Sequence, residues 1–583
     1  QAMPTWKLAR AIGLVIGSLP PDLPDPIPES IREEHNLLDL NQAYLALHQP
    51  INEQQYWQAW QRFRFEEAFT LQVALAQLRQ AAKAQGAIAR PKQTAGLLSR
   101  FDAATPFQLT QAQQRVGEEI SQALSQTQPM RRLLQGDVGS GKTVVALRAA
   151  LQVADAGGQV ALLAPTEILA NQHLATIRRL LGPLAEEGLL SQLDNPAEQL
   201  GTPSESSNPP EQVKPGLRLR LLTGSLGVAQ RRQVLADLAS GQCDLVIGTH
   251  ALLSDPVEFA NLGLVVVDEQ HRFGVEQRDK LRGRSEHPAH LLVMTATPIP
   301  RTIAMTVFGD LDVSTLDQLP PGRSPVTTHW VPANKPQWVD RVWQRVREEV
   351  DAGHRAFVVC PRISGDQAEN AEPLLDESST DLANVVDVAE QLRQTAALAG
   401  IDIGIVHGKL SAEAKDQAMA RFADGSTPVL VATVVIEVGI DVPQASIMVV
   451  LDADRFGLAQ LHQLRGRIGR GQAPGVCLLV AEPASDTPAA GRLEALVASQ
   501  DGFVLAETDL ELRREGDILG VNQSGSRRSL RLLRVLRDAK LISRTRQAAE
   551  PLVEQDPSLA NHPALVHHLA STLAQRQAFL ERT

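Results

Sequence analysis

Cysteine and aromatic residues are scarce in this chain of 583 residues, of which 4% are aromatic. The three cysteines, Cys243, Cys360 and Cys477, are far apart, each lies in or beside an apolar run, and no C-x-x-C pair occurs. This spacing argues against a zinc site and predicts small buried hydrophobes in a reduced, cytoplasmic protein. No apolar run approaches the roughly 20 residues that cross a bilayer. The opening residues, Gln1 to Pro4, lack the ordered charged and apolar regions of a signal peptide.

Positive charge is also in short supply. The chain has 56 lysines and arginines against 67 aspartates and glutamates, which gives a formal net charge of −11. This balance alone would not suggest nucleic-acid binding, although a large protein can concentrate positive charge in one channel. Apolar residues make up 43% of the chain, enough for several sizeable cores. Because the sequence begins with Gln rather than Met, we expect the natural N-terminus to lie upstream.

Short apolar runs alternate with helical stretches in two series. The first series comprises residues 159–164, 244–248, 264–267 and 291–294. The second comprises residues 356–360, 403–406, 429–432, 447–451 and 476–480. Strands that are apolar on both faces and separated by helices are typical of parallel sheets. The pattern therefore predicts an α/β protein with two doubly wound parallel-sheet domains, joined near Pro320-Pro321-Gly322.

The regions outside the two series differ in composition. Residues 1–100 begin with a proline-punctuated stretch and continue as a predicted amphipathic helix from about Asn52 to Ala89. Residues 192–216 and 364–382 are polar and lack the apolar content of a core, so we expect surface loops there. The predicted domains are residues 1–100, 101–322, 323–485 and 486–583.

Residues 136–143, Gly-Asp-Val-Gly-Ser-Gly-Lys-Thr, match the phosphate-binding pattern G-x-x-x-x-G-K-[ST]. Apolar residues precede and follow the match, which gives the strand–loop–helix context that the motif requires. The backbone N–H groups and the helix dipole of such a loop favour phosphate, Lys142 should reach the β- and γ-phosphates, and Thr143 should bind Mg²⁺. The predicted nucleotide-binding residues are Gly136, Asp137, Val138, Gly139, Ser140, Gly141, Lys142 and Thr143.

Two acidic residues and two arginines complete a candidate hydrolysis site. Asp268 and Glu269 end the apolar run 264–267, which places the first to hold Mg²⁺ through water and the second to orient the attacking water. Arg467 and Arg470 lie three apart on a helix-like turn, where guanidinium groups could stabilise charge on the γ-phosphate. A solvated basic loop is the alternative. Because the loop and the arginines lie on different domains, hydrolysis would require closure of the cleft.

Phe107 and Gln113 form a weaker candidate upstream of the phosphate-binding loop. The aromatic ring could stack on adenine while the glutamine amide reads its donor and acceptor edge. A glutamine-rich helix start explains the same residues equally well.

Several long segments together resemble the RecG family of bacterial superfamily 2 DNA helicases. The resemblance spans roughly residues 100–525 and rests on residues 164–170, 248–250, 268–275, 406–409, 437–443 and 456–463. It implies two RecA-like motor domains that use ATP and Mg²⁺, with Gly439 and Asp441 near the nucleotide. It also implies a C-terminal translocation element, a helical hairpin and loop, at residues 502–525.

The resemblance implies that the substrate is duplex DNA. The residues that it would place against the DNA are Thr166, Thr223, Gly224, Thr249, His250, His407, Gly408, Lys409, Thr433, Arg513 and Gln523. Backbone contacts of this kind give salt-dependent binding with little sequence preference. The implied activity is ATP-dependent translocation on branched duplex DNA, which remodels stalled forks, Holliday junctions and R-loops in recombination and repair. The implied enzyme is a monomer with single-stranded DNA-binding protein as a further partner.

The chain departs from the family pattern in three places. Arg513-Arg514-Glu515-Gly516 stands where the family usually has Arg-Gly-Pro-Gly, and Val434 replaces the second Thr of an Ala-Thr-Thr segment. Family members also carry an N-terminal wedge domain with an oligonucleotide-binding fold, whereas residues 1–100 lack the run of short strands that such a barrel needs. These residues resemble only the helical connection that follows the wedge. Either the sequence is truncated upstream or this form works differently.

Other functions are compatible with parts of the sequence. The transcription-repair coupling factor Mfd shares the motor and translocation element, but 583 residues leave little room for its flanking regions, and His462 in Gln-Leu-His-Gln-Leu-Arg also favours RecG. An RNA helicase is disfavoured because the translocation element belongs to duplex DNA movers. A nucleotide-dependent DNA-binding module without motor activity is the alternative from a different class. The residues that argue against such a module are Lys142, Glu269, Arg467 and Arg470.

Overall fold

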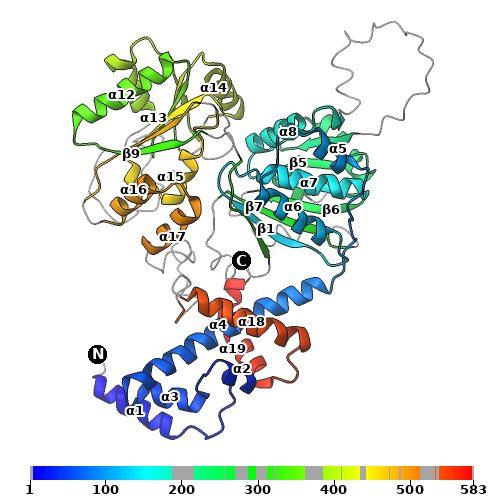
Figure 1. Ribbon diagram of the computed structural model, residues 1–583, viewed down its shortest axis with the longest axis vertical. Coiled ribbons are helices and arrows are strands. Elements are labelled where there is room, and N and C mark those ends of the chain that lie inside the picture. The colour runs from blue at the N-terminus through cyan, green and yellow to red at the C-terminus, as the bar shows by residue number, and fades with distance from the viewer. Residues whose placement is uncertain are drawn as a thin grey trace, which may run out of the picture.

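The computed structural model describes most of the chain. Its described residues are 4–186, 216–254, 257–268, 287–296, 311–320, 324–361, 385–408, 410–433, 442–471, 473–484, 487–512, 532–533 and 538–580. They form two lobes, each built on a sheet, and a helical body (Figure 1). The predicted surface loops at residues 192–216 and 364–382 lie outside this set except for residue 216.

The first lobe is built on a parallel sheet of eight strands in the order β3-β4-β5-β2-β6-β7-β1-β8. The strands are β1 (Arg131–Gly136), β2 (Gln159–Leu163), β3 (Ala185–Glu186), β4 (Leu217–Leu222), β5 (Leu245–Gly248), β6 (Leu262–Asp268), β7 (His290–Thr295) and β8 (Asp312–Leu316). Its described helices are α5 (Leu97–Ala104), α6 (Gln111–Leu124), α7 (Lys142–Asp155), α8 (Glu167–Leu181) and α9 (Val228–Ala239). Alternate strand residues enter two separate cores, Leu162 in one and Ala161 in the other, which explains the continuous apolar runs.

The second lobe repeats this architecture with a parallel sheet of six strands in the order β11-β12-β10-β13-β14-β9. The strands are β9 (Val326–Pro332), β10 (Arg355–Val359), β11 (Ile403–Val406), β12 (Val429–Ala432), β13 (Ala445–Leu451) and β14 (Gly475–Ala481). The helices are α12 (Pro336–Asp351), α13 (Val385–Gln394), α14 (Ala412–Asp424), α15 (Leu458–Arg465) and α16 (Pro488–Ala498), followed by α17 (Gly502–Leu512). The two sheets confirm the predicted fold class of paired α/β domains.

Most strands were predicted from their apolar runs, and the four that were missed lie at or next to a sheet edge. Each predicted run coincides with an observed strand to within two residues. The sequence did not indicate β3, β4, β8 or β9, which lie at or next to an edge of their sheets. At an edge, polar residues such as the exposed Thr327 of β9 interrupt the apolar run, so the pattern is lost.

The helical body combines helices that precede the two lobes in the sequence with helices that follow them (Figure 1). Its helices are α1 (Thr5–Gly17), α2 (Glu29–Glu34), α3 (Leu40–His48), α4 (Glu53–Lys83), α18 (Ala539–Gln555) and α19 (Pro563–Leu580). One apolar core contains Phe65 and Phe69 of α4 together with Ala549 and Val553 of α18. Segments that were predicted as separate regions, before and after the lobes, therefore share a single core.

Arg62 of α4 organises the polar interior of this body. Its side chain is fully buried and donates to Asp25 Oδ1 (2.6 Å), Glu66 Oε2 (2.7 Å) and the carbonyl oxygen of Leu38 (2.9 Å). Asp25 also accepts from the backbone N–H of Leu40 (3.1 Å). A buried cation needs such complete pairing, and here the pairing ties the loops before α2 and α3 to α4.

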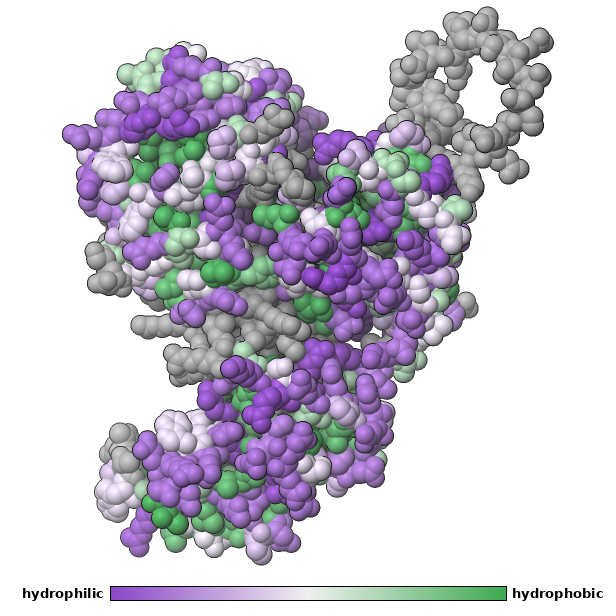
Figure 2. Space-filling model, viewed as in Figure 1, coloured by the Kyte–Doolittle hydropathy of each residue, from purple (hydrophilic) through white to green (hydrophobic). Residues whose placement is uncertain are grey.

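The cysteines are buried and the surface is mainly hydrophilic, as the composition of the chain suggested. The thiols of Cys243, Cys360 and Cys477 are free and buried, as predicted. Figure 2 shows one face of the molecule covered mainly by hydrophilic residues, with smaller apolar patches between them. Of the helices that the structure describes, none is long and apolar enough to cross a membrane.

Candidate active site

The phosphate-binding loop joins the end of β1 to the start of α7. Gly139 and Gly141 have φ angles of +82° and +85°, and a Cβ at Gly141 would lie 2.2 Å from Gln113 Nε2. Both backbone conformation and space therefore favour glycine at position 141. Lys142 Nζ donates to two carbonyl oxygens of the loop, at 2.8 and 2.9 Å. The lysine is thus held where a bound phosphate would compete for it.

Gln113 supports this loop from helix α6. Thr110 Oγ1 accepts from the Gln113 backbone N–H (3.2 Å) and Gln113 Oε1 accepts from the Thr110 N–H (2.9 Å), which forms a capping box. Gln113 Nε2 donates to the carbonyl oxygen of Ser140 (2.8 Å). The amide therefore serves the helix start and the loop together. A contact of Gln113 or the exposed Phe107 with adenine stays a prediction.

Asp268, the predicted Mg²⁺ ligand, ends β6 between β2 and β7. Its Oδ2 lies 2.8 Å from Nε2 of His173, a buried residue of α8 that the sequence did not single out. Such a partner fixes the orientation of a metal-binding carboxylate. Over the described residues, no group of three His, Cys, Asp or Glu side chains could hold a metal ion. Asp268 and Thr143 still suit Mg²⁺, which is commonly shared between one or two carboxylates and substrate phosphates. Glu269 lies outside the described residues.

Residues 466–470 of the second lobe, the arginine segment that carries Arg467 and Arg470, contact the phosphate-binding loop. Gly466 follows α15 and packs on Val138, because a Cβ at Gly466 would lie 2.9 Å from the Val138 Cβ. Arg470 Nε donates to the carbonyl oxygen of Gly466 (3.0 Å). Gly469 has a φ angle of +68°, which no continuous helix allows. Arg467 and Arg470 therefore lie on an irregular turn rather than on the helix-like turn that we expected.

A buried histidine also links the two lobes. Nε2 of His462, in α15, lies 2.6 Å from Asp137 Oδ1 of the phosphate-binding loop. Burial alone would raise the pKa of the Asp137 carboxyl, but the hydrogen bonds from His462 and the Val138 N–H, together with the charge of Lys142, outweigh it and hold that pKa below its ordinary value. The two partners are 325 residues apart in sequence, so no local pattern could have predicted their contact.

The predicted DNA contacts of the first lobe follow neighbouring parallel strands. Thr223 follows β4, Thr249 follows β5, and Thr166 lies shortly after β2. Because β5 pairs in parallel register with both β2 and β4, the three threonines lie along one edge of the sheet. Glu167 Oε1 accepts from the backbone N–H of Ser225 (3.1 Å), which ties the segments after β2 and β4 together. Two further predicted contacts are adjacent to them in sequence, Gly224 and His250.

The second lobe repeats this arrangement. His407 follows β11 and Thr433 follows β12, and the Thr433 N–H donates to the carbonyl oxygen of Val406 (3.3 Å). The adjacent Gly408 carbonyl accepts from Lys415 Nζ (3.0 Å). The Thr433 hydroxyl, like that of Thr249 in the first lobe, is buried without a hydrogen-bond partner in the described structure. The predicted residues that fall outside the described ranges are, besides Glu269, Lys409, Gly439, Asp441, Arg513 and Gln523.

Comparison with known proteins identifies the family. Residues 110–306 match the DEAD/DEAH box helicase family, residues 341–472 match the helicase conserved C-terminal domain, and residues 499–570 match the C-terminal domain 3 of ATP-dependent DNA helicase RecG. The ATP-dependent DNA helicase RecG of Mycobacterium leprae is 45% identical over 565 residues, which cover 96% of this chain and 73% of the relative. That of Bacillus subtilis is 41% identical over 534 residues, 92% of this chain and 71% of the relative. The chain belongs to the RecG family.

A solved RecG structure has the same architecture. RecG bound to a three-way DNA junction matches with a TM-score of 0.65 and 37% sequence identity, over 93% of this chain and 64% of the RecG chain. The present chain thus spans less than two thirds of that RecG chain. RecG membership confirms the predicted resemblance and the predicted class of enzyme, an ATP-dependent DNA helicase. It favours neither the Mfd-like alternative nor a module without motor activity.

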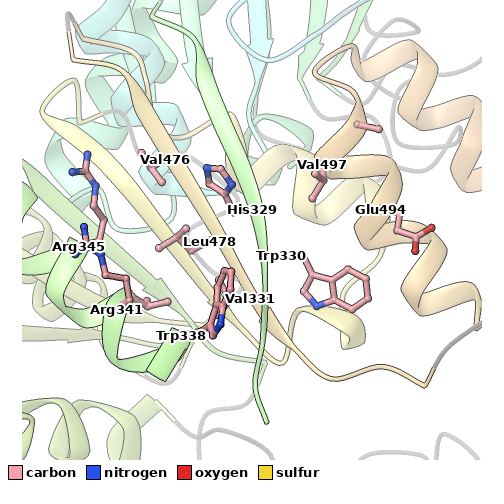
Figure 3. Close-up of a pocket in the computed structure, with 12 residues that line it drawn as sticks. His329, Trp330, Val331, Trp338, Arg341, Arg345, Val476, Leu478, Glu494 and Val497 are labelled. Carbon is pink, nitrogen blue, oxygen red and sulfur yellow. The ribbon is translucent and has the colours of Figure 1, made fainter. Parts of the chain in front are cut away.

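A separate groove of about 680 Å³ lies on the second lobe of this RecG-family chain. Figure 3 shows Trp330 of β9, Trp338 of α12 and Val497 of α16 around it. Arg341 also lines the groove but is paired with Glu348 (2.7 Å). No residue that lines the groove belongs to the predicted nucleotide or DNA sets, so the groove is distinct from the candidate active site.

Proposed function

We propose that this chain acts as a RecG-type motor, which hydrolyses ATP to move along duplex DNA and remodels stalled forks, Holliday junctions and R-loops. The observation that carries the proposal is the contact between lobes at the phosphate-binding loop, through Gly466 on Val138 and His462 on Asp137. Hydrolysis at a site shared by two lobes can be coupled to their relative motion. The three-way junction bound by the solved RecG supports branched DNA as the substrate class.

The first lobe supplies most of the proposed hydrolysis chemistry. Lys142 binds the β- and γ-phosphates, while Thr143 and Asp268 hold Mg²⁺. The ion, when bound, neutralises charge on the phosphate oxygens. Glu269 orients the attacking water. The hydrogen bond from His173 supports this assignment because it fixes the Asp268 carboxylate at the strand end.

The second lobe completes the site in this proposal. Arg467 and Arg470 stabilise the charge that develops on the γ-phosphate, with Gly439 and Asp441 near the nucleotide. The packing of Gly466 on the phosphate-binding loop supports the arginine assignment, because it brings the segment that carries both guanidinium groups to that loop. A solvated basic loop would have no such contact.

The DNA path in the proposal follows the carboxyl edges of the two sheets. In the first sheet β4, β5 and β2 carry the predicted DNA contacts, and β6, β7 and β1 continue the same edge toward the nucleotide. Helix α8 spans the boundary between the two halves, since Thr166 is its N-cap and His173 bonds Asp268. A DNA contact at the start of α8 could thereby influence the orientation of the metal ligand.

We also propose that the enzyme acts as a monomer in the cytoplasm, with single-stranded DNA-binding protein as a partner. The support for the partner and for the monomer is the family resemblance. The support for the compartment is the presence of three free, buried thiols.

DNA-stimulated ATP hydrolysis tests the proposal. Forked duplex DNA should raise the hydrolysis rate of the chain, and Lys142→Ala should abolish hydrolysis because the phosphates lose their cation. Glu269→Gln should retain ATP binding but block turnover, because the metal ligands remain while the water loses its orienting carboxylate. Hydrolysis that forked DNA does not raise, or normal hydrolysis by Lys142→Ala, would overturn the proposed motor function.

A further inference from the structure

Three side chains form a continuous row of hydrogen bonds from the first lobe into the second. Asp137 Oδ1 lies 2.6 Å from His462 Nε2, and His462 Nδ1 lies 2.9 Å from Arg465 Nη2. His462 and Arg465 are only 6% and 3% exposed. They are three residues apart in α15, so they share one face of that helix.

The partners of His462 determine where its proton lies. A guanidinium can only donate, so Nδ1 must accept from Arg465 and the neutral imidazole carries its proton on Nε2. Nε2 therefore donates to the Asp137 carboxylate. Both ring nitrogens are thus hydrogen-bonded, Nε2 to the Asp137 carboxylate of the phosphate-binding loop and Nδ1 to the Arg465 guanidinium of the second lobe. A displacement of either partner must move the ring or break a bond.

Arg465 in turn holds the last turn of α16 and the chain that follows it. Its Nη1 donates to the carbonyl oxygens of Leu496 (2.9 Å) and Ser499 (2.7 Å), and its Nη2 donates to that of Gln500 (3.2 Å). Three main-chain acceptors on one planar guanidinium fix this turn as a unit. The turn leads directly into α17, which also packs on α15. Helix α17 lies in the segment that matches RecG domain 3.

We propose that His462 is a positioning residue that couples the phosphate-binding loop to α17. Lys142 Nζ donates to the carbonyl oxygens of Gly136 and Asp137, so a phosphate that draws the lysine toward itself pulls on the part of the loop that carries the Asp137 side chain. The displacement passes through His462 and Arg465 to the turn before α17. His462 does not touch the reacting atoms. The inference rests on the proposed function, because it concerns the step that converts hydrolysis into movement of DNA.

The number of base pairs unwound for each ATP hydrolysed tests this coupling. The full chain, His462→Ala and His462→Gln would be compared on forked DNA, with unwinding and phosphate release measured in the same reactions. His462→Gln should keep the ratio of the unchanged chain, because its amide can donate to Asp137 and accept from Arg465. His462→Ala should still hydrolyse ATP, but its ratio should fall about tenfold, the size expected from losing one charge-assisted hydrogen bond.

A second variant breaks the same row at its other end. Asp137→Ala removes a loop side chain rather than a core one, so it tests the coupling even if His462→Ala fails to fold. Its ratio of base pairs unwound to ATP hydrolysed should also fall. The ratio of the double variant should be no lower than that of either single variant, because each single variant already lacks the bond between Asp137 and His462. A ratio unchanged in either single variant, or reductions that multiply in the double variant, would overturn the coupling role. Failure of the proposed function looks different, since the unchanged chain would then unwind no forked DNA.

Discussion

At the scale of single residues, the candidate site depends on side chains other than those that the sequence assigned to phosphate, Mg²⁺ or the transition state. His173 orients Asp268, His462 bonds Asp137, and Gln113 holds the phosphate-binding loop through Ser140. Each of these residues is buried, and each bonds a partner that is distant in the sequence. A substitution of one of these supporting residues is therefore expected to disturb hydrolysis, although the residue itself does not contact the reacting atoms.

The bond from His173 to Asp268 leads to the first prediction. His173→Ala should lower DNA-stimulated turnover about 10- to 100-fold and raise the Mg²⁺ concentration needed for half-maximal rate, because the carboxylate loses its orienting partner. ATP hydrolysis measured across a Mg²⁺ titration checks this effect. His173→Gln is the matched control, since its amide can replace the ring N–H donor. An unchanged Mg²⁺ requirement in His173→Ala would show that the bond has no role at the metal site.

The three thiols should be inert while the protein is folded. Burial raises the pKa values of Cys243, Cys360 and Cys477 to about 12, so the reactive thiolate is absent near neutral pH. A chromogenic disulfide reagent at pH 8 should label none of them in the native protein and all three in urea. Because native thiols hold their protons above their unfolded pKa of 9.0, stability should also decline as pH rises past that value. Rapid native labelling of any one cysteine would contradict its burial.

At the scale of elements, the sequence was informative where local pattern and tertiary burial agree. The apolar runs of β6 and β10 are buried on both faces, and the glycines of the phosphate-binding loop mark a backbone that only they adopt easily. Helix α4 was also predicted, although it ends at Lys83 rather than near Ala89. Contacts such as that of Arg62 with Asp25 were beyond prediction, because they depend on how elements pack and not on their own pattern.

Helix α4 carries the next prediction, through its buried arginine. Arg62→Met should destabilise the helical body by about 3–5 kcal/mol, because Asp25 and Glu66 would then be left without their shared cation. Hydrogen exchange of α4, followed across a urea series, measures this local stability. Arg546→Met is the control in the same body, since its pair with Glu550 is partly exposed and should matter much less. Equal effects of the two substitutions would show that burial of the Arg62 network does not increase the stability of the helical body.

At the scale of the whole molecule, neither lobe contains a complete candidate site. The phosphate-binding loop and the predicted metal ligands belong to the first lobe, whereas the segment that carries Arg467 and Arg470 belongs to the second and contacts the loop at Val138. The sequence predicted this division, because the motifs fall in different series of strands. It could not predict which residues make the contact, since Gly466 and Val138 meet only through the packing of the two lobes.

The division predicts how loss of an arginine should affect the enzyme. Arg470→Ala should lower turnover by about 10³-fold, because an arginine finger acts on the transition state. ATP affinity should change far less, since the phosphate-binding loop is intact. Single-turnover hydrolysis and nucleotide titration separate the two effects. Arg421→Ala, which removes an exposed guanidinium from the same lobe, should leave both near normal. Normal turnover in Arg470→Ala would remove that residue from the finger role.

The shared core of the helical body has a consequence for synthesis of the protein. Phe65 and Phe69 on α4 are covered in part by α18, yet the ribosome must make both lobes before that helix exists. At 5–20 residues per second, the delay is roughly 20–90 s. During this time the apolar side of α4 is not yet covered by α18 and can bind other unfinished chains or chaperones. A circular permutant that makes α18 directly before α4 should therefore aggregate less during expression.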